Sequence, residues 1–397
     1  MYKKLEVAIA ACTDKGVLRK SNEDAFLAAD LKTGQSLADG YNGRIEELLL
    51  AVSDGMGGQR RGDIASQMTL QCLLDTMLRI SSKTPAYERL VTAVENTNHK
   101  VFAQSNGTLE YAGMGATLTA AFVTGDKCYV AEVGDSRAYL LRQNRIKLLT
   151  TDQSMLQVFV SRGLITEEEA AKSSYRSLLL QAIGTKDEIE VAVTSFALRT
   201  GDCLLLCSDG LSNKLSEADM LRLATQYSLT DAAKKMVQLA NERGGEDNIT
   251  VLLARLTGEG LKGEERLTKT FKVLSSFDPD RPKQRKQTER LVSAPQQSNL
   301  IFANTVGLAD PNRTLSDYEQ IKQLHSDFEQ LSYHLDEATL LLESQIRELK
   351  LAANWLQQGG AIDKRLTEII IRLKNTQTNL EQTRKTVKEA KEVFEKI

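Results

Sequence analysis

The composition and residue pattern of this sequence change twice, near residues 257 and 314, and these changes divide the chain into three regions. Residues 1–256 mix short β-rich runs, glycine-rich turns and amphipathic helical patterns. Residues 257–313 are polar and contain four of the five prolines, whereas residues 314–397 contain none. We therefore expect a globular N-terminal domain, a flexible linker and a helical C-terminal region within the 397 residues.

The first region combines strand-like runs with helical patterns. Residues 116–123 and 127–133 are apolar runs separated by Thr124-Gly125-Asp126, which predicts a hairpin, and residues 137–141 continue as a third strand. Further strand-like runs occupy residues 48–53, 202–208 and 248–254, and helical patterns occupy residues 64–80 and 86–103. Because strands and helices do not alternate regularly, the pattern predicts a layered α+β domain rather than repeated βαβ units.

The third region carries apolar residues at alternating spacings of three and four. Two such stretches flank Gly359-Gly360, so we expect two long helices joined by a turn. Two helices alone form a thin core, and three arrangements would complete it: a homodimeric four-helix bundle, packing on a partner helix, or folding against the first domain. The pattern is compatible with dimerisation, targeting or inhibition by residues 314–397.

The composition bears on partners and location. The formal net charge of -2 gives no electrostatic reason to expect nucleic acid or an anionic membrane as the main partner. No run approaches the roughly 20 apolar residues that span a bilayer, and the N-terminal residues lack the apolar core of a signal peptide, so a cytoplasmic location is expected.

The five cysteines are scattered and have no paired Cys or His cluster near them, which argues against a zinc site. Cys203 and Cys207 lie four apart in an apolar run and are predicted to point to one face of a strand. We expect all five to be reduced thiols of the core.

Acidic residues recur beside glycine or asparagine at the ends of strand-like runs. The five sites are Glu23-Asp24, Asp54-Gly55, Gly134-Asp135, Asp209-Gly210 and Asp247-Asn248. One Asp-Gly pair is an ordinary turn, but carboxylates that converge from several strand ends repel one another unless cations hold them. Oxygen ligands without His or Cys select Mg²⁺, Mn²⁺ or Ca²⁺ over zinc.

Two further features point to a phosphate chemistry at such a centre. Small residues follow Asp54 in the run DGMGG, so the backbone can approach a metal or ligand closely and a carbonyl can join the coordination sphere. Arg19 lies four residues before Glu23. A guanidinium at this place can bind a phosphate through two N–H groups while metals hold the opposite side.

Together these segments resemble the metal-dependent protein phosphatase 2C family, especially its bacterial members. The matching motifs, in order, are DKGVLRKSNED (14–24), AVSDGMGG (51–58), GMGATL (113–118), VGDSRAY (133–139), LTTD (149–152), QAIG (181–184), CSDGL (207–211) and GEDNIT (245–250). The resemblance covers about residues 5–256. Each motif alone is weakly specific, whereas the full set in this order is strongly specific.

The resemblance implies a fold of two packed antiparallel β-sheets flanked by helices, and it implies roles for individual residues. Asp54 would bridge two Mn²⁺ or Mg²⁺ ions, and the carbonyl of Gly55 would bind one of them. Asp209 and Asp247 would hold the first ion. In relatives the water between the two ions acts as the nucleophile on phosphoserine or phosphothreonine of a protein substrate, without a covalent enzyme intermediate.

The remaining implied roles fall on the N-terminal motif and on the turn at Gly134. Glu23 and Asp24 would bind on the side of the second ion, partly through water. Asp135 would serve a third, weaker ion that many relatives contain. Arg19 would bind the substrate phosphate and stabilise charge on its oxygens.

The sequence departs from the family pattern in the flap, at about residues 153–183. Gln153 stands where many relatives have His after the aspartate, and the usual bacterial His-Pro-x-Arg-Asn is replaced by SYRS at residues 174–177. Met56 stands where some eukaryotic relatives have a histidine proposed as general acid. These departures bear on flap geometry and substrate preference rather than on metal binding.

Two functions from different classes fit these observations. The first is an active phosphatase at residues 1–256, joined by a linker (257–313) to a helical region (314–397). The second is a regulatory binding or scaffolding module built on a phosphatase fold that has lost most or all of its catalytic activity. Asp54, Asp209 and Asp247 are all present, whereas a retired site tolerates the loss of such ligands, so the sequence favours the enzyme.

Overall fold

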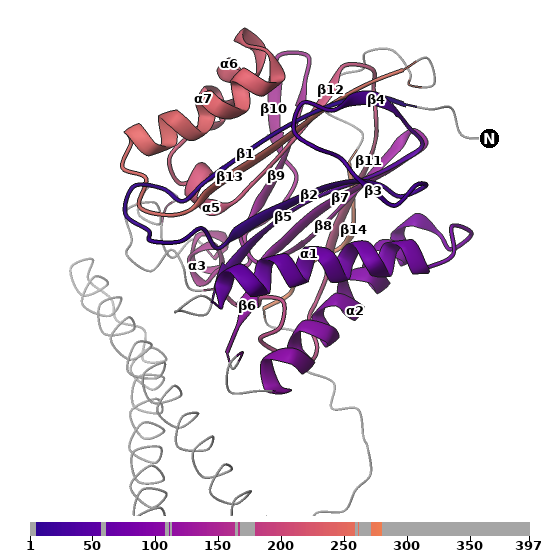
Figure 1. The fold of residues 1–397 in the computed structure, drawn as a ribbon, viewed down its shortest axis with the longest axis vertical. Coiled ribbons are helices and arrows are strands. Elements are labelled where there is room, and N and C mark those ends of the chain that lie inside the picture. Colours follow the sequence, from indigo (N-terminus) through magenta and orange to yellow (C-terminus); the bar gives the residue numbers. More distant parts are fainter. Residues whose placement is uncertain are drawn as a thin grey trace, which may run out of the picture. The chain divides into compact units, whose positions relative to one another are not determined.

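The computed structural model describes residues 5–56, 61–107, 111, 113–162, 166, 179–258, 261 and 271–279. Their strands form two antiparallel sheets (Figure 1). The first sheet has the order β10 (Arg145–Leu148), β9 (Arg137–Arg142), β12 (Asp202–Cys207), β13 (Ile249–Thr257), β1 (Leu5–Asp14) and β4 (Asn42–Ile45). The second has the order β14 (Phe271–Ser275), β11 (Ala192–Ala197), β8 (Lys127–Val133), β7 (Leu118–Thr124), β5 (Glu47–Met56), β2 (Asp24–Asp30) and β3 (Gln35–Ser36), with β6 (Gly115–Ala116) paired to β5.

Strand β5 shows why the sheets stack as they do. Its residues are buried almost without interruption, and successive side chains point to opposite faces of a strand. Leu48, Leu50 and Val52 enter the core between the two sheets, whereas Leu49 and Ala51 enter a second core beneath helices. A strand covered on both faces needs a continuous apolar run, which is what residues 48–52 supply.

Helices cover the outer face of each sheet (Figure 1). Helices α1 (Gly62–Arg79) and α2 (Ala86–Gly107) pack on the second sheet, while α6 (Glu217–Gln226) and α7 (Leu229–Glu242) pack on the first. Short helices α3 (Met155–Ser161) and α5 (Asp209–Ser212) follow β10 and β12. The layered α+β prediction is confirmed, and the predicted helices at residues 64–80 and 86–103 correspond to α1 and α2.

The predicted hairpin is also confirmed, because β7 and β8 pair from Leu118 with Val133 to Thr124 with Lys127. The third strand, β9, is present but lies in the other sheet, where it pairs with β10 and β12. Gly134 makes this crossing possible: its φ of 108° lies in the region that glycine alone adopts readily.

The cysteine prediction is confirmed in part, because Cys128, Cys203 and Cys207 are buried whereas Cys12 and Cys72 are only partly buried. All five cysteines are free. Cys203 and Cys207 share one face of β12 and enter the core beneath α6 and α7, whereas the intervening Leu204 and Leu206 enter the core between the sheets.

Strand β14 lies inside the segment predicted as linker. It pairs with the edge strand β11 from Phe196 and Phe271 to Val193 and Ser275, so the second sheet includes residues well beyond 256. The predicted helices of residues 314–397 and most of the linker lie outside the described residues. In the described part of the chain, no helix has the length and apolar character needed to cross a membrane.

Candidate active site

The topology of the two sheets brings the acidic strand ends to one edge. Strands β5 and β8 run parallel to each other because each pairs antiparallel with β7, so Asp54 near the end of β5 and Asp135 just after β8 lie at the same edge. Strand β2 runs antiparallel to β5, and its first residue, Asp24, stands directly opposite Asp54. The second sheet therefore supplies three carboxylates.

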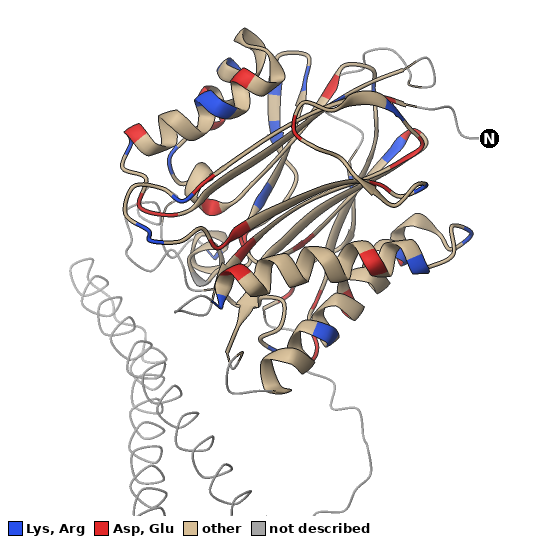
Figure 2. Ribbon diagram, in the orientation of Figure 1, with Lys and Arg blue, Asp and Glu red and all other residues tan. Residues whose placement is uncertain are grey.

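The first sheet supplies two more from the facing edge. Asp209 follows β12 and opens α5, and Asp247 precedes β13. These two strands are antiparallel neighbours, so the end of one and the start of the other coincide. Figure 2 shows acidic segments gathered at the strand ends beside α5 and the start of α1.

One cavity of about 250 Å³ collects these side chains. Seven of the eight residues predicted for the site line it: Arg19, Glu23, Asp54, Gly55, Asp135, Asp209 and Asp247. The eighth, Asp24, is 8% exposed and lies behind the lining, where the hydroxyl of Ser208 donates a hydrogen bond to its Oδ2 at 2.7 Å. The sequence prediction thus identified residues that are far apart in the chain and adjacent in space.

The carboxylates perturb one another strongly. Burial, followed by repulsion from Asp24 and Asp209, raises the pKa of Asp54 well above its ordinary value. Burial, followed by Asp209, does the same to the pKa of Asp135. The pKa of Asp24 rises to about 7, mainly through burial, and that of Asp209 to about 6, through burial and then Asp247. Such a cluster favours a bound cation, because a positive charge offsets both the cost of burying ionised carboxylates and their mutual repulsion.

The donor set fits divalent cations that prefer oxygen. Oδ1 of Asp209, which lines the cavity, and Oδ1 of Asp24 behind the lining are buried and have no hydrogen-bond partner in the described chain, so acceptor capacity remains at and next to the cavity. Among the described residues that line the cavity there is no histidine or cysteine, so the set suits Mn²⁺ or Mg²⁺ better than zinc. Among the described residues, no three acidic, His or Cys side chains already stand in a complete ligating geometry.

Arg19 lies at the rim of the cavity. Its side chain is 49% exposed, and its Nη2 donates to Oδ2 of Asp247 at 2.8 Å. The guanidinium has five N–H donors in all, and this bond uses one of them. The rim position is what contact with a phosphate from solvent requires.

Gly55 is needed because the backbone packs closely around it. A Cβ at this position would collide with the carbonyl oxygen of Gly62 and would stand 2.8 Å from that of Glu23. The backbone N–H of Gly55 also donates to the carbonyl of Glu23 at 3.1 Å. Gly55 therefore allows the first turn of α1 to lie against the acidic loop, a close approach of backbone to backbone where the sequence pattern predicted the approach of a metal or ligand.

Three polar residues that the sequence reasoning gave no role hold the site in place. Asn248 accepts from the backbone N–H of Glu23 and donates to the carbonyls of Lys15 and Ser21, so it fixes the N-terminal loop. Thr117 accepts from the backbone N–H of Asp54 at 2.9 Å. Ser208 binds Asp24, as described above. All three lie within the motifs quoted earlier (GEDNIT, GMGATL and CSDGL), and their membership of these motifs could have identified them from the sequence.

Gln153 replaces the expected histidine and is 1% exposed. Its Oε1 accepts from the backbone N–H of Gly134 at 2.9 Å and from Nε2 of Gln181 at 2.8 Å, and its own backbone N–H donates to the carbonyl of Gly134. The residue therefore ties both ends of the predicted flap to the turn that carries Asp135. The altered SYRS segment lies outside the described residues.

Comparison with known proteins gives a consistent result. The sequence model described as protein phosphatase 2C matches residues 21–254. The serine/threonine phosphatase stp of Listeria welshimeri is 36% identical over 245 residues, which are 61% of this chain and 92% of that protein. The serine/threonine protein phosphatase PstP of Mycobacterium tuberculosis is 34% identical over 253 residues, 63% of this chain and 45% of that protein.

Solved structures agree. The M. tuberculosis phosphatase PstP/Ppp is matched with a TM-score of 0.56 and 34% identity, covering 64% of this chain and all of that one. The catalytic domain of PstP in complex with two manganese ions is matched with a TM-score of 0.54 and 33% identity, again over 64% of this chain and all of that one.

Proposed function

We infer that this chain, which belongs to the protein phosphatase 2C family, is a metal-dependent serine/threonine phosphatase acting on phosphoproteins. The observation that carries the inference is the cavity in which seven predicted residues from both sheets meet. The relatives named above are serine/threonine phosphatases, and one relative's structure contains two manganese ions.

The residues at the cavity divide into four proposed roles. Asp54, Gly55, Asp209 and Asp247 would hold two Mn²⁺ or Mg²⁺ ions, with Asp54 between them. Such ions lower the pKa of bound water and neutralise charge on a phosphoryl group. The buried, mutually repelling carboxylates and their unpartnered oxygens support this assignment.

Glu23 and Asp24 would act on the side of the second ion, and Asp135 would serve a weaker third ion. Burial, opposed by Arg19, raises the pKa of Glu23. Arg19 would bind the phosphate at the rim through the N–H groups that Asp247 does not occupy, and so would orient the phosphorus toward the buried carboxylates.

Turnover of p-nitrophenyl phosphate and of a phosphothreonine peptide, measured during titration with Mn²⁺ and Mg²⁺, tests the proposal. We expect turnover that requires metal, ends on chelation, and falls steeply in Asp209→Asn. A folded protein without metal-dependent turnover would instead support the alternative, a regulatory scaffold built on an inactive phosphatase fold.

We further propose that residues 314–397 form paired helices, tethered by a linker, that dimerise the enzyme or bind a partner helix. The support is the heptad-like apolar spacing on both sides of Gly359-Gly360. A chain ended after residue 279 keeps β14 and is the suitable comparison in sedimentation. We expect the shortened chain to sediment as a monomer with retained turnover. If the full-length and shortened chains have the same oligomeric state, dimerisation through residues 314–397 is excluded.

A further inference from the structure

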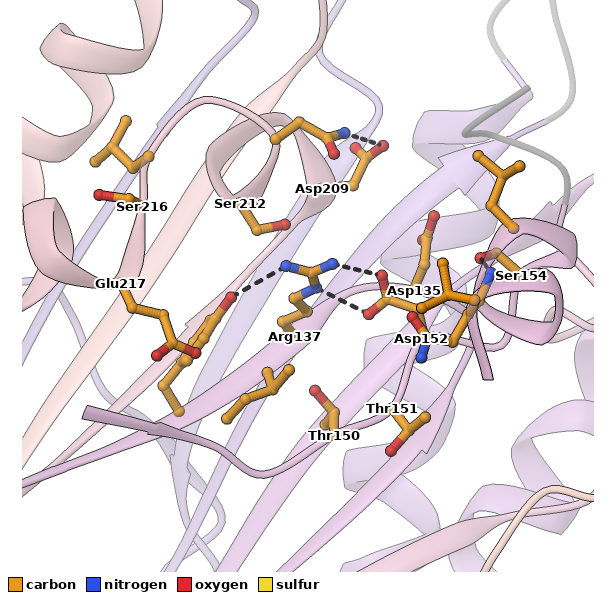
Figure 3. Close-up of a pocket in the computed structure, with 17 residues that line it drawn as sticks. Asp135, Arg137, Thr150, Thr151, Asp152, Ser154, Asp209, Ser212, Ser216 and Glu217 are labelled. Atoms are coloured by element: carbon orange, nitrogen blue, oxygen red, sulfur yellow. Dashed lines mark hydrogen bonds and ion pairs between the residues drawn. The ribbon is translucent and has the colours of Figure 1, made fainter. Parts of the chain in front are cut away.

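A second cavity, of about 560 Å³, adjoins the acidic one (Figure 3). Asp135 and Asp209 line both cavities, so the second begins where the proposed metal site ends. It extends over β9 and α3 to the start of α6. Its volume lies in the range of about 300–1,000 Å³ that is typical of ligand sites.

The most central charges of this cavity already compensate each other. Arg137 donates to both carboxylate oxygens of Asp152, at 2.8 and 2.7 Å, and reaches the hydroxyl of Tyr139 at 3.4 Å. Figure 3 shows the paired Arg137 and Asp152 side chains in the middle of the cavity. A bidentate pair of this kind leaves little net charge to attract a ligand.

Glu217 is different, because its carboxylate has no hydrogen bond or ion pair within the described part of the chain. It is the first residue of α6 and is exposed. Ser216 and Asp219 form a reciprocal capping box that fixes the start of the helix, so Glu217 is held at the cavity wall on a rigid element. In Figure 3 it lies on the opposite side of Arg137 from Asp135.

The wall of this second cavity is apolar in part. Tyr139, Leu148, Leu156 and Leu215 line it, and three of them are buried, with exposures of 1%, 9% and 3% for Tyr139, Leu156 and Leu215. A cavity with a partly apolar wall, and with an unpaired carboxylate at the end away from Asp135, suits a long side chain with an aliphatic stem and a cationic head. Lysine and arginine have this form.

We propose that the second cavity is a subsite for a lysine or arginine of the phosphoprotein substrate, close in sequence to the phosphorylated residue, and that Glu217 selects it. The proposal rests on the proposed function, because the phosphorylated residue must occupy the neighbouring acidic cavity. Glu217 is thereby a specificity-determining residue that contacts substrate but not the reacting phosphorus.

Phosphothreonine peptides with arginine, alanine or glutamate at each position flanking the phosphothreonine provide the test. For the wild type we expect kcat/KM to be highest with arginine at one flanking position, by about twofold to fivefold over alanine, which is the range of an exposed ion pair. The preference should decrease with added salt. It should appear mainly in KM.

Two substitutions sharpen the test. Glu217→Gln should remove the preference for arginine, and Glu217→Lys should reverse it in favour of glutamate at the same position. Glu95→Gln, at an exposed position on α2, is the matched control and should keep the wild-type preference. Turnover of p-nitrophenyl phosphate, which has no flanking residues, should be the same in the wild type and Glu95→Gln, and its measurement in the two Glu217 variants shows whether the reacting centre is intact.

The outcomes distinguish a failure of the subsite proposal from a failure of the proposed phosphatase function on which it rests. Equal kcat/KM for the three peptides at every position, or an arginine preference that survives in Glu217→Lys, overturns the subsite while p-nitrophenyl phosphate turnover upholds the enzyme. Loss of p-nitrophenyl phosphate turnover in the wild type overturns the proposed function and the subsite with it.

Discussion

Replacement of Glu132 by glutamine tests how burial controls ionisation beside the active site. Glu132 lies on β8, is 6% exposed, and accepts with both oxygens from the backbone N–H of Thr151, at 2.9 and 3.0 Å. Burial raises the pKa of Glu132 from 4.5 to about 8, with a smaller contribution from Asp152 and opposition from the Thr151 and Gln153 hydrogen bonds. The folded protein therefore retains a proton on this group that the unfolded chain has released.

The sign and size of the effect follow from proton linkage. Between pH 4.5 and about 8 the folded state binds one proton more at this position than the unfolded state, so the associated stability is complete below pH 4.5 and is lost as the pH rises toward 8. Each pH unit within that window lowers the free energy of unfolding by about 1.4 kcal/mol. Over two units, from about pH 5.5 to 7.5, the loss is about 2.7 kcal/mol.

Glutamine resembles the protonated acid in shape and does not titrate, so Glu132→Gln should remove this dependence. Urea unfolding of metal-free protein at several pH values gives the difference in free energy between variant and wild type, in which the other carboxylates cancel. We expect that difference to move in favour of the variant by about 2–3 kcal/mol over the two units. Glu95→Gln, an exposed control on α2, should give a constant difference. A constant difference for Glu132→Gln as well would refute the reasoning.

Three further substitutions address the site itself. Asp209→Asn should lower metal-dependent turnover of p-nitrophenyl phosphate at least about 100-fold and weaken Mn²⁺ binding in calorimetry, while circular dichroism stays unchanged; near-normal turnover would remove Asp209 from the proposed metal shell. Gln153→Ala leaves the Gly134 N–H and Gln181 Nε2 without their shared acceptor and should cost about 1–3 kcal/mol for each group left unpaired, measured by urea unfolding; a loss below about 0.5 kcal/mol would show that the network is not required. Gly55→Ala forces a Cβ against the Gly62 and Glu23 carbonyls and should reduce turnover and Mn²⁺ affinity together, whereas Gly40→Ala, at an open turn position, should change stability but not affinity.

The sequence predicted local features, and the residues that gather at the candidate site, more successfully than the placement of strands. Apolar runs and the turn at Gly125 were sufficient for the β7–β8 hairpin, because pairing there is between neighbours in the chain. The transfer of β9 to the other sheet was not predictable, since it depends on a backbone angle at Gly134 and on long-range pairing with β12. Strand β14 was missed for a similar reason: its residues are mostly exposed and join only the edge of a sheet.

The acidic residues were predicted because the motifs contain the residue types that metal binding needs, and five of them line the cavity together with Arg19 and Gly55. What the motifs did not reveal is the support behind them. Gln153 looked like a departure from the family pattern, yet it bonds the turn at Gly134 twice, because its Oε1 accepts from the Gly134 N–H and its backbone N–H donates to the Gly134 carbonyl. The second cavity could not be foreseen either, because it forms only when β9, α3 and α6 come together.

The division of the carboxylates between the two sheets has a consequence for stability. Asp24 and Asp54 belong to one sheet and Asp209 and Asp247 to the edge of the other, so a cation held by both pairs is a cross-link between the two layers. Ligand binding to the native state alone adds about 2.7 kcal/mol at a concentration of 100 times Kd. Removal of divalent cations would then lower the free energy of unfolding of this domain as well as its turnover.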